Sequence, residues 1–357
     1  MESNSNHKLW SATGPRGDYL YNTWYVAGWS DELSDTPWAR TFLDERVALF
    51  RDQHGAAHAI GGICPHRFAS LGHGKVVDGT LQCPYHGLQF DSAGVCVFNP
   101  HENGVVPKVG VQVYPLQERH RLLWIWMGDP EQADASRIPD FSWLADPRWL
   151  AVRGTKVAEG HYELYSDNIM DLGHTNFVHS ALQATSWSTG KRRFWQDGDE
   201  VWAEYDHPDD YLSVGISAIL GVAGRKQDLW TTIRWNAPAV MFLDFRAGEP
   251  GTPRDELTGL PSLHAFTPET ANTTHYIWAV ARDFAHDNTE LTQIKHEALQ
   301  YAFEHEDMPT IRDTHHNMAG RRFDTLQPIS LTGDAAGLRA RRTLARLIHD
   351  ERGGTDG

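Results

Sequence analysis

Long apolar segments and an excess of basic residues are both missing from this chain. No apolar run reaches the roughly 18 residues of a membrane span, so no transmembrane helix is expected. The 32 Lys and Arg are outnumbered by 47 Asp and Glu, and the formal charge of -15 disfavours a nucleic-acid partner, because phosphates are bound by clustered basic side chains. Residues 1–17 are polar and lack the apolar core of a signal peptide, which predicts a cytosolic protein.

Cysteine is also scarce, with three residues in the chain. Two of them stand beside a histidine, in the motifs Cys64-x-His66 and Cys83-x2-His86. Each motif offers one thiolate and one imidazole, so together they could hold two irons in unequal environments. This is the ligand set of a Rieske [2Fe-2S] cluster. The third, Cys96, then has no disulfide partner, which suits a reducing compartment, and we expect it to be buried in a strand.

A structural zinc site is the alternative for these motifs, because two Cys and two His also satisfy tetrahedral zinc. Zinc modules usually pair Cys with Cys and His with His over short spacings, whereas here each half has one Cys and one His. The spacing favours the iron–sulfur cluster. Colour separates the two, since an iron–sulfur protein is red-brown and a zinc protein is colourless.

The chain is long enough for two domains with separate cores. Short strand patterns and turns come first, and a segment with three prolines and several acids follows them. Beyond it, long strand-like runs combine with helical patterns at about 161–180, 288–318 and 334–351, which predicts an α+β arrangement. The predicted division is an extension at 1–18, a small all-β domain at 19–128, a linker at 129–148 and an α+β domain at 149–357.

A second candidate metal site combines Asn168, Asp171, His174 and His179. Two His and one carboxylate, with open coordination positions, form the facial triad of non-haem Fe(II) oxygenases. The two His are five residues apart and would diverge by about 140° on an ideal helix, so we expect a departure from α geometry near Gly173. Asp171 is close enough to His174 on a helix for its carboxylate to accept a hydrogen bond from that imidazole.

Both motifs resemble those of the Rieske non-haem iron oxygenases, in particular the α subunits of the vanillate and dicamba O-demethylase branch. Further matching segments lie at residues 21–27, 233–236, 264–270 and 333–336, so the resemblance covers nearly the whole chain. It implies an N-terminal all-β Rieske [2Fe-2S] domain followed by a helix-grip (START-like) catalytic domain with an antiparallel sheet.

The resemblance also implies a mononuclear Fe(II) bound by His174, His179 and a carboxylate from a late helix. Asp307 is the predicted carboxylate, with Glu304 and Glu306 as alternatives, because sequence alone leaves the helical register open by a residue or more.

In the family, the aspartate of this motif connects an iron-binding His to a cluster-binding His of the next chain. Carried over, Asp171 would connect His174 to the partner subunit's His86 within a head-to-tail homotrimer. Asn168 would lie near the iron as a polar neighbour.

Asn236 and His264 stand where related demethylases contact a carboxylated aromatic substrate. Ala298 replaces a pocket tryptophan of the dicamba enzyme, so dicamba itself is not expected. The implied protein is the terminal oxygenase of a monooxygenase, which receives NAD(P)H electrons through a flavin- and ferredoxin-type reductase or a ferredoxin. It would use O2 to demethylate a methoxylated aromatic acid, releasing formaldehyde. Ring hydroxylation or dihydroxylation by the same metals is one alternative, and a Rieske electron-transfer protein is an alternative of another class.

Overall fold

The computed structural model describes most of the chain, in the ranges 8–10, 17–101, 105–179, 181 and 190–353. The chain divides into two compact units. The first consists of Met1–Asp140 and Pro268–Ala271, and the second consists of Phe141–Thr267 and Asn272–Gly357. The division between residues 140 and 141 falls inside the segment predicted as a linker. Most of the predicted extension at 1–18 lies outside the described residues. None of the described helices is both long enough and apolar enough to cross a membrane.

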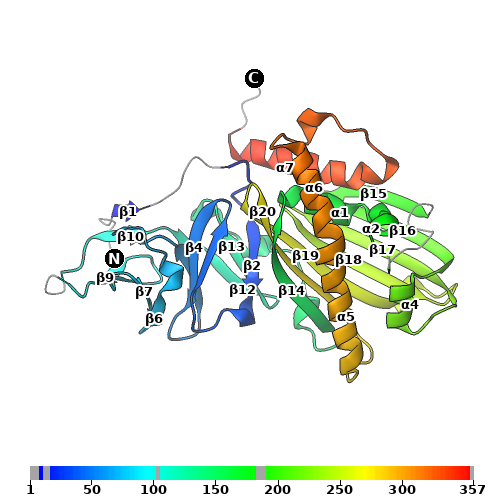
Figure 1. The fold of residues 1–357 in the computed structure, drawn as a ribbon, viewed down its shortest axis with the longest axis horizontal. Coiled ribbons are helices and arrows are strands. Elements are labelled where there is room, and N and C mark those ends of the chain that lie inside the picture. Colours follow the sequence, from blue (N-terminus) through cyan, green and yellow to red (C-terminus); the bar gives the residue numbers. More distant parts are fainter. Residues whose placement is uncertain (1–7, 11–16, 102–104, 180, 182–189, 354–357) are drawn as a thin grey trace. The chain divides into compact units, whose positions relative to one another are not determined.

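The first unit consists of short strands joined by turns, which confirms the all-β prediction (Figure 1). Its central strand β13 is an unbroken apolar run that is completely buried, as expected of a strand covered on both faces. The sheets, in strand order, are β11(Val113–Tyr114)-β5(Ala57–Gly61)-β4(Glu45–Arg51)-β3(Trp38–Phe42), β12(Leu116–Arg119)-β13(Leu122–Trp126)-β2(Trp24–Trp29), β6(Lys75–Val77)-β7(Thr80–Gln82)-β8(Gln89–Phe90)-β9(Cys96–Phe98) and β1(Lys8–Trp10)-β10(Val109–Val111). Among the described residues, the 3-10 turns of this unit are η1 Ser30–Glu32, η2 Leu71–His73, η4 Pro130–Gln132 and η5 Ala135–Arg137.

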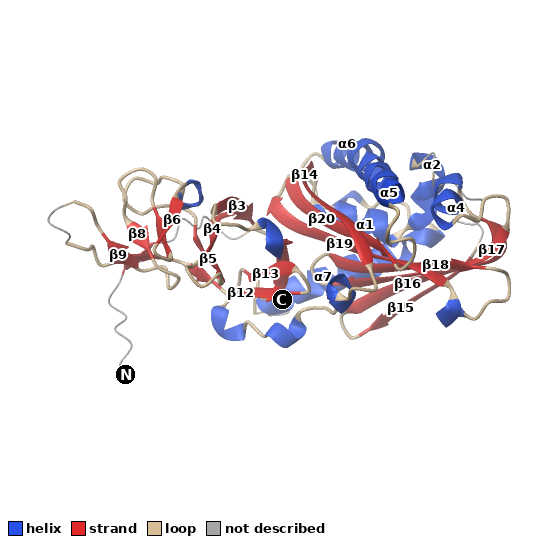
Figure 2. Ribbon diagram, turned by 90° about the horizontal axis from the view of Figure 1, so that it is seen from below, coloured by secondary structure: helices blue, strands red, loops and turns tan. Residues whose placement is uncertain are grey.

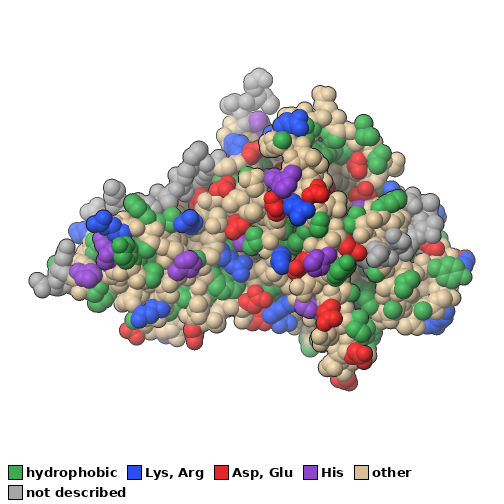
Figure 3. Space-filling view, in the orientation of Figure 1, with side chains coloured by type: hydrophobic (Ala, Val, Ile, Leu, Met, Phe, Trp, Pro, Cys, Tyr) green, Lys and Arg blue, Asp and Glu red, His purple; other side chains and the backbone are tan. Residues whose placement is uncertain are grey.

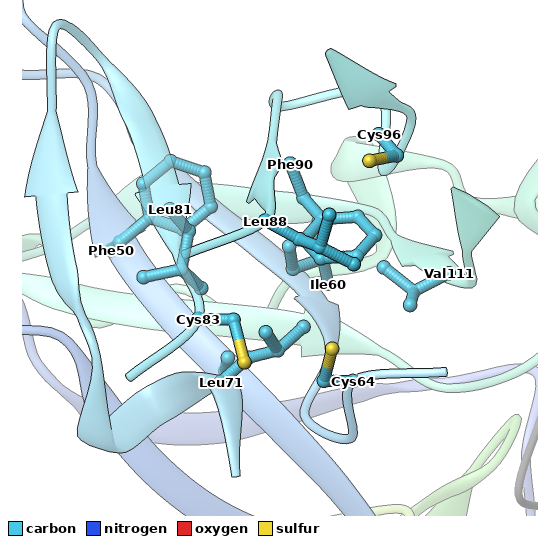
Figure 4. Packing of buried hydrophobic residues seen from close by; sticks show 11 residues of the cluster. Phe50, Ile60, Cys64, Leu71, Leu81, Cys83, Leu88, Phe90, Cys96 and Val111 are labelled. Carbon is cyan, nitrogen blue, oxygen red and sulfur yellow. The ribbon is translucent and has the colours of Figure 1, made fainter. Parts of the chain in front are cut away.

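A cluster of buried side chains supports the loops that carry the two Cys/His motifs. Its fully buried aromatic and aliphatic members include Phe50, Ile60, Leu81 and Phe90. Burying each such side chain is worth about 1.5–3 kcal/mol, so the loops rest on a rigid base. Figure 4 shows the sulfurs of Cys64 and Cys83 at one end of this cluster, while Cys96 lies apart from them.

The second unit is a seven-stranded sheet with helices, as predicted for an α+β domain with a large antiparallel sheet. Figure 2 shows α5 and α6 packed over one face of this sheet. The strand order is β14(Leu150–Glu159)-β20(Thr273–Arg282)-β19(Thr258–Thr270)-β18(Val240–Gly248)-β17(Lys226–Asn236)-β16(Glu200–Tyr211)-β15(Lys191–Asp197). The described helices are α1 Tyr162–Met170, α2 Thr175–Val178, α4 Val214–Leu220, α5 Thr289–Tyr301, α6 Met308–Met318 and α7 Ala335–Glu351, with the π-helix η9 Ala302–Asp307 and the 3-10 turns η6 Ser142–Ala145, η7 Leu172–His174, η8 Arg254–Glu256, η10 Asp324–Leu326 and η11 Thr332–Asp334.

Alternation along the strands assigns each side chain of the sheet to one of two faces. Tyr205 of β16 donates from its hydroxyl to the backbone oxygen of Met170 in α1 at 3.0 Å, so its side chain faces that helix. The strand register then puts a row of four residues on the same helix-covered face, namely Val201, Trp235, Met241 and His264. The alternate residues point to the other face, where Arg234 lies over the rings of Phe141, Trp202 and Phe242.

The C-terminal helix α7 packs on the sheet through a stripe of residues spaced four apart, which is one face of an α-helix. Ala336, Ala340, Leu344 and Ile348 form this stripe, and all are buried. On the face drawn in Figure 3, basic and acidic side chains are interspersed over the surface.

Candidate metal centres

The two Cys/His loops have the same backbone conformation. In each, the cysteine N–H donates to the carbonyl oxygen five residues later, and the cysteine oxygen accepts from the N–H four residues later, at 2.8–3.2 Å. That fourth residue, Phe68 in one loop and Gly87 in the other, has a positive φ of 62° and 73°. Glycine adopts this conformation at no steric cost, whereas Phe68 is held in it by the loop. The loops therefore present their Cys and His residues in equivalent positions.

The two sulfurs lie within hydrogen-bonding distance of each other and are buried. The hydrogen bond between them lowers the pKa of Cys83 to about 6 and raises that of Cys64. Each sulfur also accepts hydrogen bonds from two backbone N–H groups that follow it in its own loop. Such hydrogen bonds stabilise thiolate sulfur, which is the form that binds iron.

The two imidazoles lie side by side, with ring centroids 4.5 Å apart. His66 is exposed and His86 is half-buried, so the thiols are on the inner side and the imidazoles on the outer side. The Nδ1 atom of His86 is buried and makes no hydrogen bond to any described residue. A buried polar atom without a partner is costly, and a metal bond would satisfy it. The four donors therefore fit a [2Fe-2S] cluster. Cys96 is buried in β9 apart from them, as predicted.

A second group of metal-ligating side chains combines His174, His179 and Asp307, whose ligand atoms lie within 4.8 Å of one another. Asp307 Oδ1 is 3.3 Å from Nε2 of His179 and 3.6 Å from Nε2 of His174. Within the described ranges it is the one group of three or more His, Cys, Asp or Glu residues with this geometry. Two His and one carboxylate in this arrangement are the donor set of a facial triad.

The chain departs from α geometry at Asp171, two residues before the predicted position. Asp171 is extended, with φ -120° and ψ 99°, and ends α1; the 3-10 turn η7 then begins and places the rings of His174 and His179 with their centroids 5.2 Å apart. The predicted convergence of the imidazoles is thus confirmed. The predicted hydrogen bond from His174 to the Asp171 carboxylate is wrong. That carboxylate caps η7 by accepting from Gly173 N at 2.9 Å, and His174 Nδ1 lies 2.6 Å from the Asp171 backbone oxygen.

The three acidic residues at the end of the π-helix point to different partners. Glu304 pairs with Lys156 at 2.9 Å, and Glu306 Oε2 lies 2.8 Å from Nδ1 of His179. Asp307 faces both histidines and also accepts a hydrogen bond from the side-chain amide of Asn168 at 3.1 Å. Of the three acids, Asp307 is therefore the one whose carboxylate lies beside Nε2 of both histidines.

Burial and neighbouring charge act differently on the two imidazoles. Burial lowers the pKa of His174 and outweighs the opposing charge of Asp307, so this ring is neutral, as a metal ligand must be. Burial also lowers the pKa of His179, but the hydrogen bonds and charges of Asp307 and Glu306 outweigh it and raise that pKa. Protons and metal compete for such an imidazole.

His264 lies buried on the helix-covered face, between two hydroxyl groups. Its Nδ1 is 2.7 Å from the Tyr276 hydroxyl and its Nε2 is 3.1 Å from Ser262 Oγ. Burial lowers the pKa of His264 to about 4 and raises that of Tyr276, so the imidazole is neutral and the phenol keeps its proton. Ser262 donates its only hydroxyl proton to the backbone oxygen of Leu243, so it accepts from Nε2, and Tyr276 then donates to Nδ1.

Asn236 was predicted to share a substrate pocket with His264, and this placement is wrong. The register pairs Asn236 with Val240 and Val240 with Ala265, one position out of step with the row that contains His264. Successive strand residues point to opposite faces, so Asn236 points away from the helices. Its side-chain amide donates to Glu200 Oε1 at 2.8 Å instead. Met241 is the residue of β18 directly beside His264 on the helix-covered face.

An ion-pair network behind the His motif was missed by the sequence analysis. Arg341 of α7 makes three hydrogen bonds to Asp167, the shortest of 2.6 Å being from Nη2, and a fourth to Glu163 at 2.8 Å. Its side chain is only 16% exposed. The network ties α7 to α1 directly beside Asn168. The basic stretch of α7 was visible in the sequence, but which arginine turns inward depends on the helix partner.

Two family models match the chain. The Rieske [2Fe-2S] domain matches residues 23–115, and the vanillate O-demethylase oxygenase C-terminal domain matches residues 158–350. The oxygenase component of dicamba O-demethylase from Stenotrophomonas maltophilia is 38% identical, over 92% of this chain and 98% of its own length. The oxygenase component of chloroacetanilide N-alkylformylase from Rhizorhabdus wittichii is 36% identical, over 93% and 97%.

Solved structures agree with these relatives. Dicamba monooxygenase bound to 3,6-dichlorosalicylic acid has a TM-score of 0.89 at 37% identity, covering 94% of this chain and 99% of that one. Another crystal structure of dicamba monooxygenase, at 35% identity, contains non-haem iron and dicamba. The zinc alternative for the Cys/His loops is therefore wrong, because the matching domain carries a [2Fe-2S] cluster.

Proposed function

The chain belongs to the vanillate O-demethylase family of Rieske oxygenases, and from that premise we propose that it removes the methyl group of a methoxylated aromatic acid. It is the terminal oxygenase component of a monooxygenase system, with a [2Fe-2S] cluster and a mononuclear non-haem iron. A reductase or ferredoxin supplies its electrons. Membership of an oxygenase family removes the electron-carrier alternative.

We assign the metal ligands from the donor groups described above. Cys64 and Cys83 hold one iron of the cluster, and His66 and His86 hold the other. The assignment is supported by the buried sulfurs with their backbone N–H donors and by the unpaired Nδ1 of His86.

The mononuclear iron is assigned to Nε2 of His174, Nε2 of His179 and the carboxylate of Asp307. Convergence of these three groups from two distant segments is the observation that carries the proposed function. Residues 19–128 then form the cluster domain and residues 149–357 the domain of the mononuclear iron.

When bound, the cluster supplies electrons singly and the mononuclear iron supplies the site at which O2 is reduced. For each methyl group, one O2, two electrons and two protons are consumed. One oxygen atom enters a methyl C–H bond and the other leaves as water. The resulting hemiacetal breaks the bond between the former methyl carbon and the ether oxygen, and its hydroxyl proton passes to that oxygen, which gives a phenol and formaldehyde.

His264 is the residue that we propose for binding the substrate carboxylate. Tyr276 donates to its Nδ1, so its proton sits on Nε2, on the side of Ser262. Ser262 in turn donates to the backbone oxygen of Leu243 at 3.2 Å, which fixes the direction of this chain of hydrogen bonds. To bind the substrate, this Nε2–H would exchange Ser262 for a carboxylate oxygen, and a neutral imidazole does so without forming a buried ion pair.

We further propose that the protein works as a head-to-tail homotrimer in the cytosol, where NAD(P)H is available to its reductase. In this arrangement Asp171 connects His174 to the partner subunit's His86. Asp171 is suited to the task because it adjoins the iron-binding turn while its backbone oxygen already holds His174.

The test is a formaldehyde assay over a panel of methoxybenzoates, with a generic reductase, NADH and measured O2 uptake. We expect one member to give formaldehyde and phenol in equal amounts, with none from the Asp307→Ala variant. O2 uptake with a hydroxylated ring product and no formaldehyde would overturn demethylation in favour of ring hydroxylation.

A further inference from the structure

The two histidines of the proposed iron site are held by different kinds of acceptor. Nδ1 of His174 donates to a neutral group, the backbone oxygen of Asp171, at 2.6 Å. Nδ1 of His179 donates to a carboxylate oxygen of Glu306 at 2.8 Å. With its proton on Nδ1, each imidazole would present the lone pair of Nε2 to a metal, and both Nε2 atoms lie beside Asp307. Only the second contact adds a negative charge.

Glu306 and Asp307 contact the imidazole of His179 at different nitrogen atoms. Glu306 contacts Nδ1 of His179, while Asp307 Oδ1 lies 3.3 Å from Nε2. The two acids are consecutive, and both lie in the π-helix η9. π-turns change the direction of side chains relative to a regular α-helix and are frequent at functional sites. Here both carboxylates reach one buried ring, whose side chain is 4% exposed.

The formal charges of Fe(II), Asp307 and Glu306 also sum to zero. Two neutral imidazoles and the Asp307 carboxylate would leave one unit of positive charge around Fe(II), and Glu306 cancels it. The Glu306 side chain is 15% exposed, so solvent screens this interaction less than it would at the surface. A carboxylate behind a metal-bound histidine makes the imidazole a stronger donor and fixes its tautomer.

We propose that Glu306 is a positioning residue for the iron, which fixes His179 with its proton on Nδ1 and raises the affinity of Nε2 for the metal. Glu306 does not bind the iron itself. This inference rests on the proposed iron site and adds to it the residue that orients one of its ligands.

The test compares Glu306→Gln with Glu304→Gln in the full-length protein. Glu304 is the matched control, because it is two residues away in the same π-helix and pairs with Lys156 and Gln300 instead. Fe(II) affinity is measured anaerobically by competition with a chelator, in protein whose cluster absorption shows that the fold is intact. We expect Glu306→Gln to weaken Fe(II) binding about 10- to 100-fold and Glu304→Gln to change it by less than about twofold.

A redox titration of the mononuclear iron gives a second measurement that a purely structural role would not move. Loss of the Glu306 charge should shift its midpoint potential to a more positive value, because the ferric state depends more on negative charge. Glu306→Asp, which keeps the charge, should recover most of the affinity. Equal impairment of the Gln and Asp variants, or wild-type affinity and potential in Glu306→Gln, would overturn the proposal while leaving the oxygenase function intact. Failure of the wild-type protein to bind iron at this site would instead overturn the proposed site itself.

Discussion

The side-chain amide of Asn168 donates a hydrogen bond to the carboxylate of Asp307 at 3.1 Å, across 139 positions of the sequence. It contacts Oδ1, the same oxygen that faces both histidines. This hydrogen bond joins the end of α1 to the π-helix, so the ligands from the two segments are held together before any metal binds. Preorganisation of this kind raises metal affinity, because less conformational freedom is lost on binding.

Asn168→Leu should weaken Fe(II) binding about tenfold, since hydrogen bonds to charged groups contribute more than those between neutral groups. Chelator competition measures the effect. Asn317→Leu, at an exposed position of α6, is the control and should bind iron like the wild type. Unchanged affinity in Asn168→Leu would show that the amide does not orient Asp307.

Electron transfer between subunits can be tested by mixing two inactive variants. His66→Ala removes a proposed cluster ligand, and Asp307→Ala removes a proposed iron ligand. In randomly mixed head-to-tail trimers about a quarter of the interfaces join an intact cluster to an intact iron, so about a quarter of the activity should return. Transfer within one chain predicts no recovery on mixing.

Asp171→Asn keeps a side-chain oxygen for the cap on Gly173, so this variant should retain both metals. If Asp171 carries the connection between subunits, turnover with the reductase should nevertheless fall strongly. Iron content and cluster absorption are measured beside formaldehyde release. Normal turnover in this variant would refute the proposed connection.

Substrate affinity should depend on His264 and not on Asn236, because the two side chains lie on opposite faces of the sheet. His264→Leu is expected to raise KM about tenfold, because leucine has no donor to replace the Nε2–H that would bind the substrate. Asn236→Ala should leave KM unchanged. Steady-state kinetics with the best methoxybenzoate distinguish them, and the opposite pattern would reverse the assignment of the faces.

The stability of the second unit should fall in acid partly because of His264. Its folded-state pKa of about 4 lies below the value of about 6.5 in an unfolded chain, so the unfolded state binds more protons between these values. Stability is therefore lost as pH falls from about 6.5 to about 4, by on the order of 3 kcal/mol. Urea midpoints of wild type and His264→Gln, compared at several pH values, isolate this contribution. Parallel curves for the two proteins would contradict it.

Arg341→Met should destabilise the second unit by about 3 kcal/mol, because Asp167 and Glu163 would lose their partner in a largely buried site, and Asp167, whose pKa burial already raises to about 6, would relieve part of the cost by taking up a proton. Arg342→Met changes an exposed neighbour in the same helix and should cost less than about 0.5 kcal/mol. Urea unfolding measures both. Equal effects would mean that Arg341 contributes only as a surface residue.

Two sequence-based expectations, for Asp171 and Asn236, are wrong because they depend on geometry that the sequence pattern does not contain. The helix through Asp171 ends because its carboxylate caps the next turn, a competition that short polar side chains often win. The π-turn at residues 302–307 alters the direction of each acidic side chain, which is why helical spacing left Glu304 and Glu306 open beside the predicted Asp307. Asn236 was expected on the same face as His264, but the strand register puts it one position away. One position in a strand turns the side chain to the opposite face of the sheet.

The sequence by itself determined the β-rich first unit, the Cys/His loops and the pair His174 and His179, because these features depend on residues that are close together in the chain and on the alternation of side chains along strands. Only the tertiary structure decided which carboxylate meets the histidines, which acid holds His179 and which polar residue shares their side of the sheet. Those relations join residues up to 139 positions apart, and they follow from the register of the sheet and the turn geometry of the helices, which no local pattern encodes.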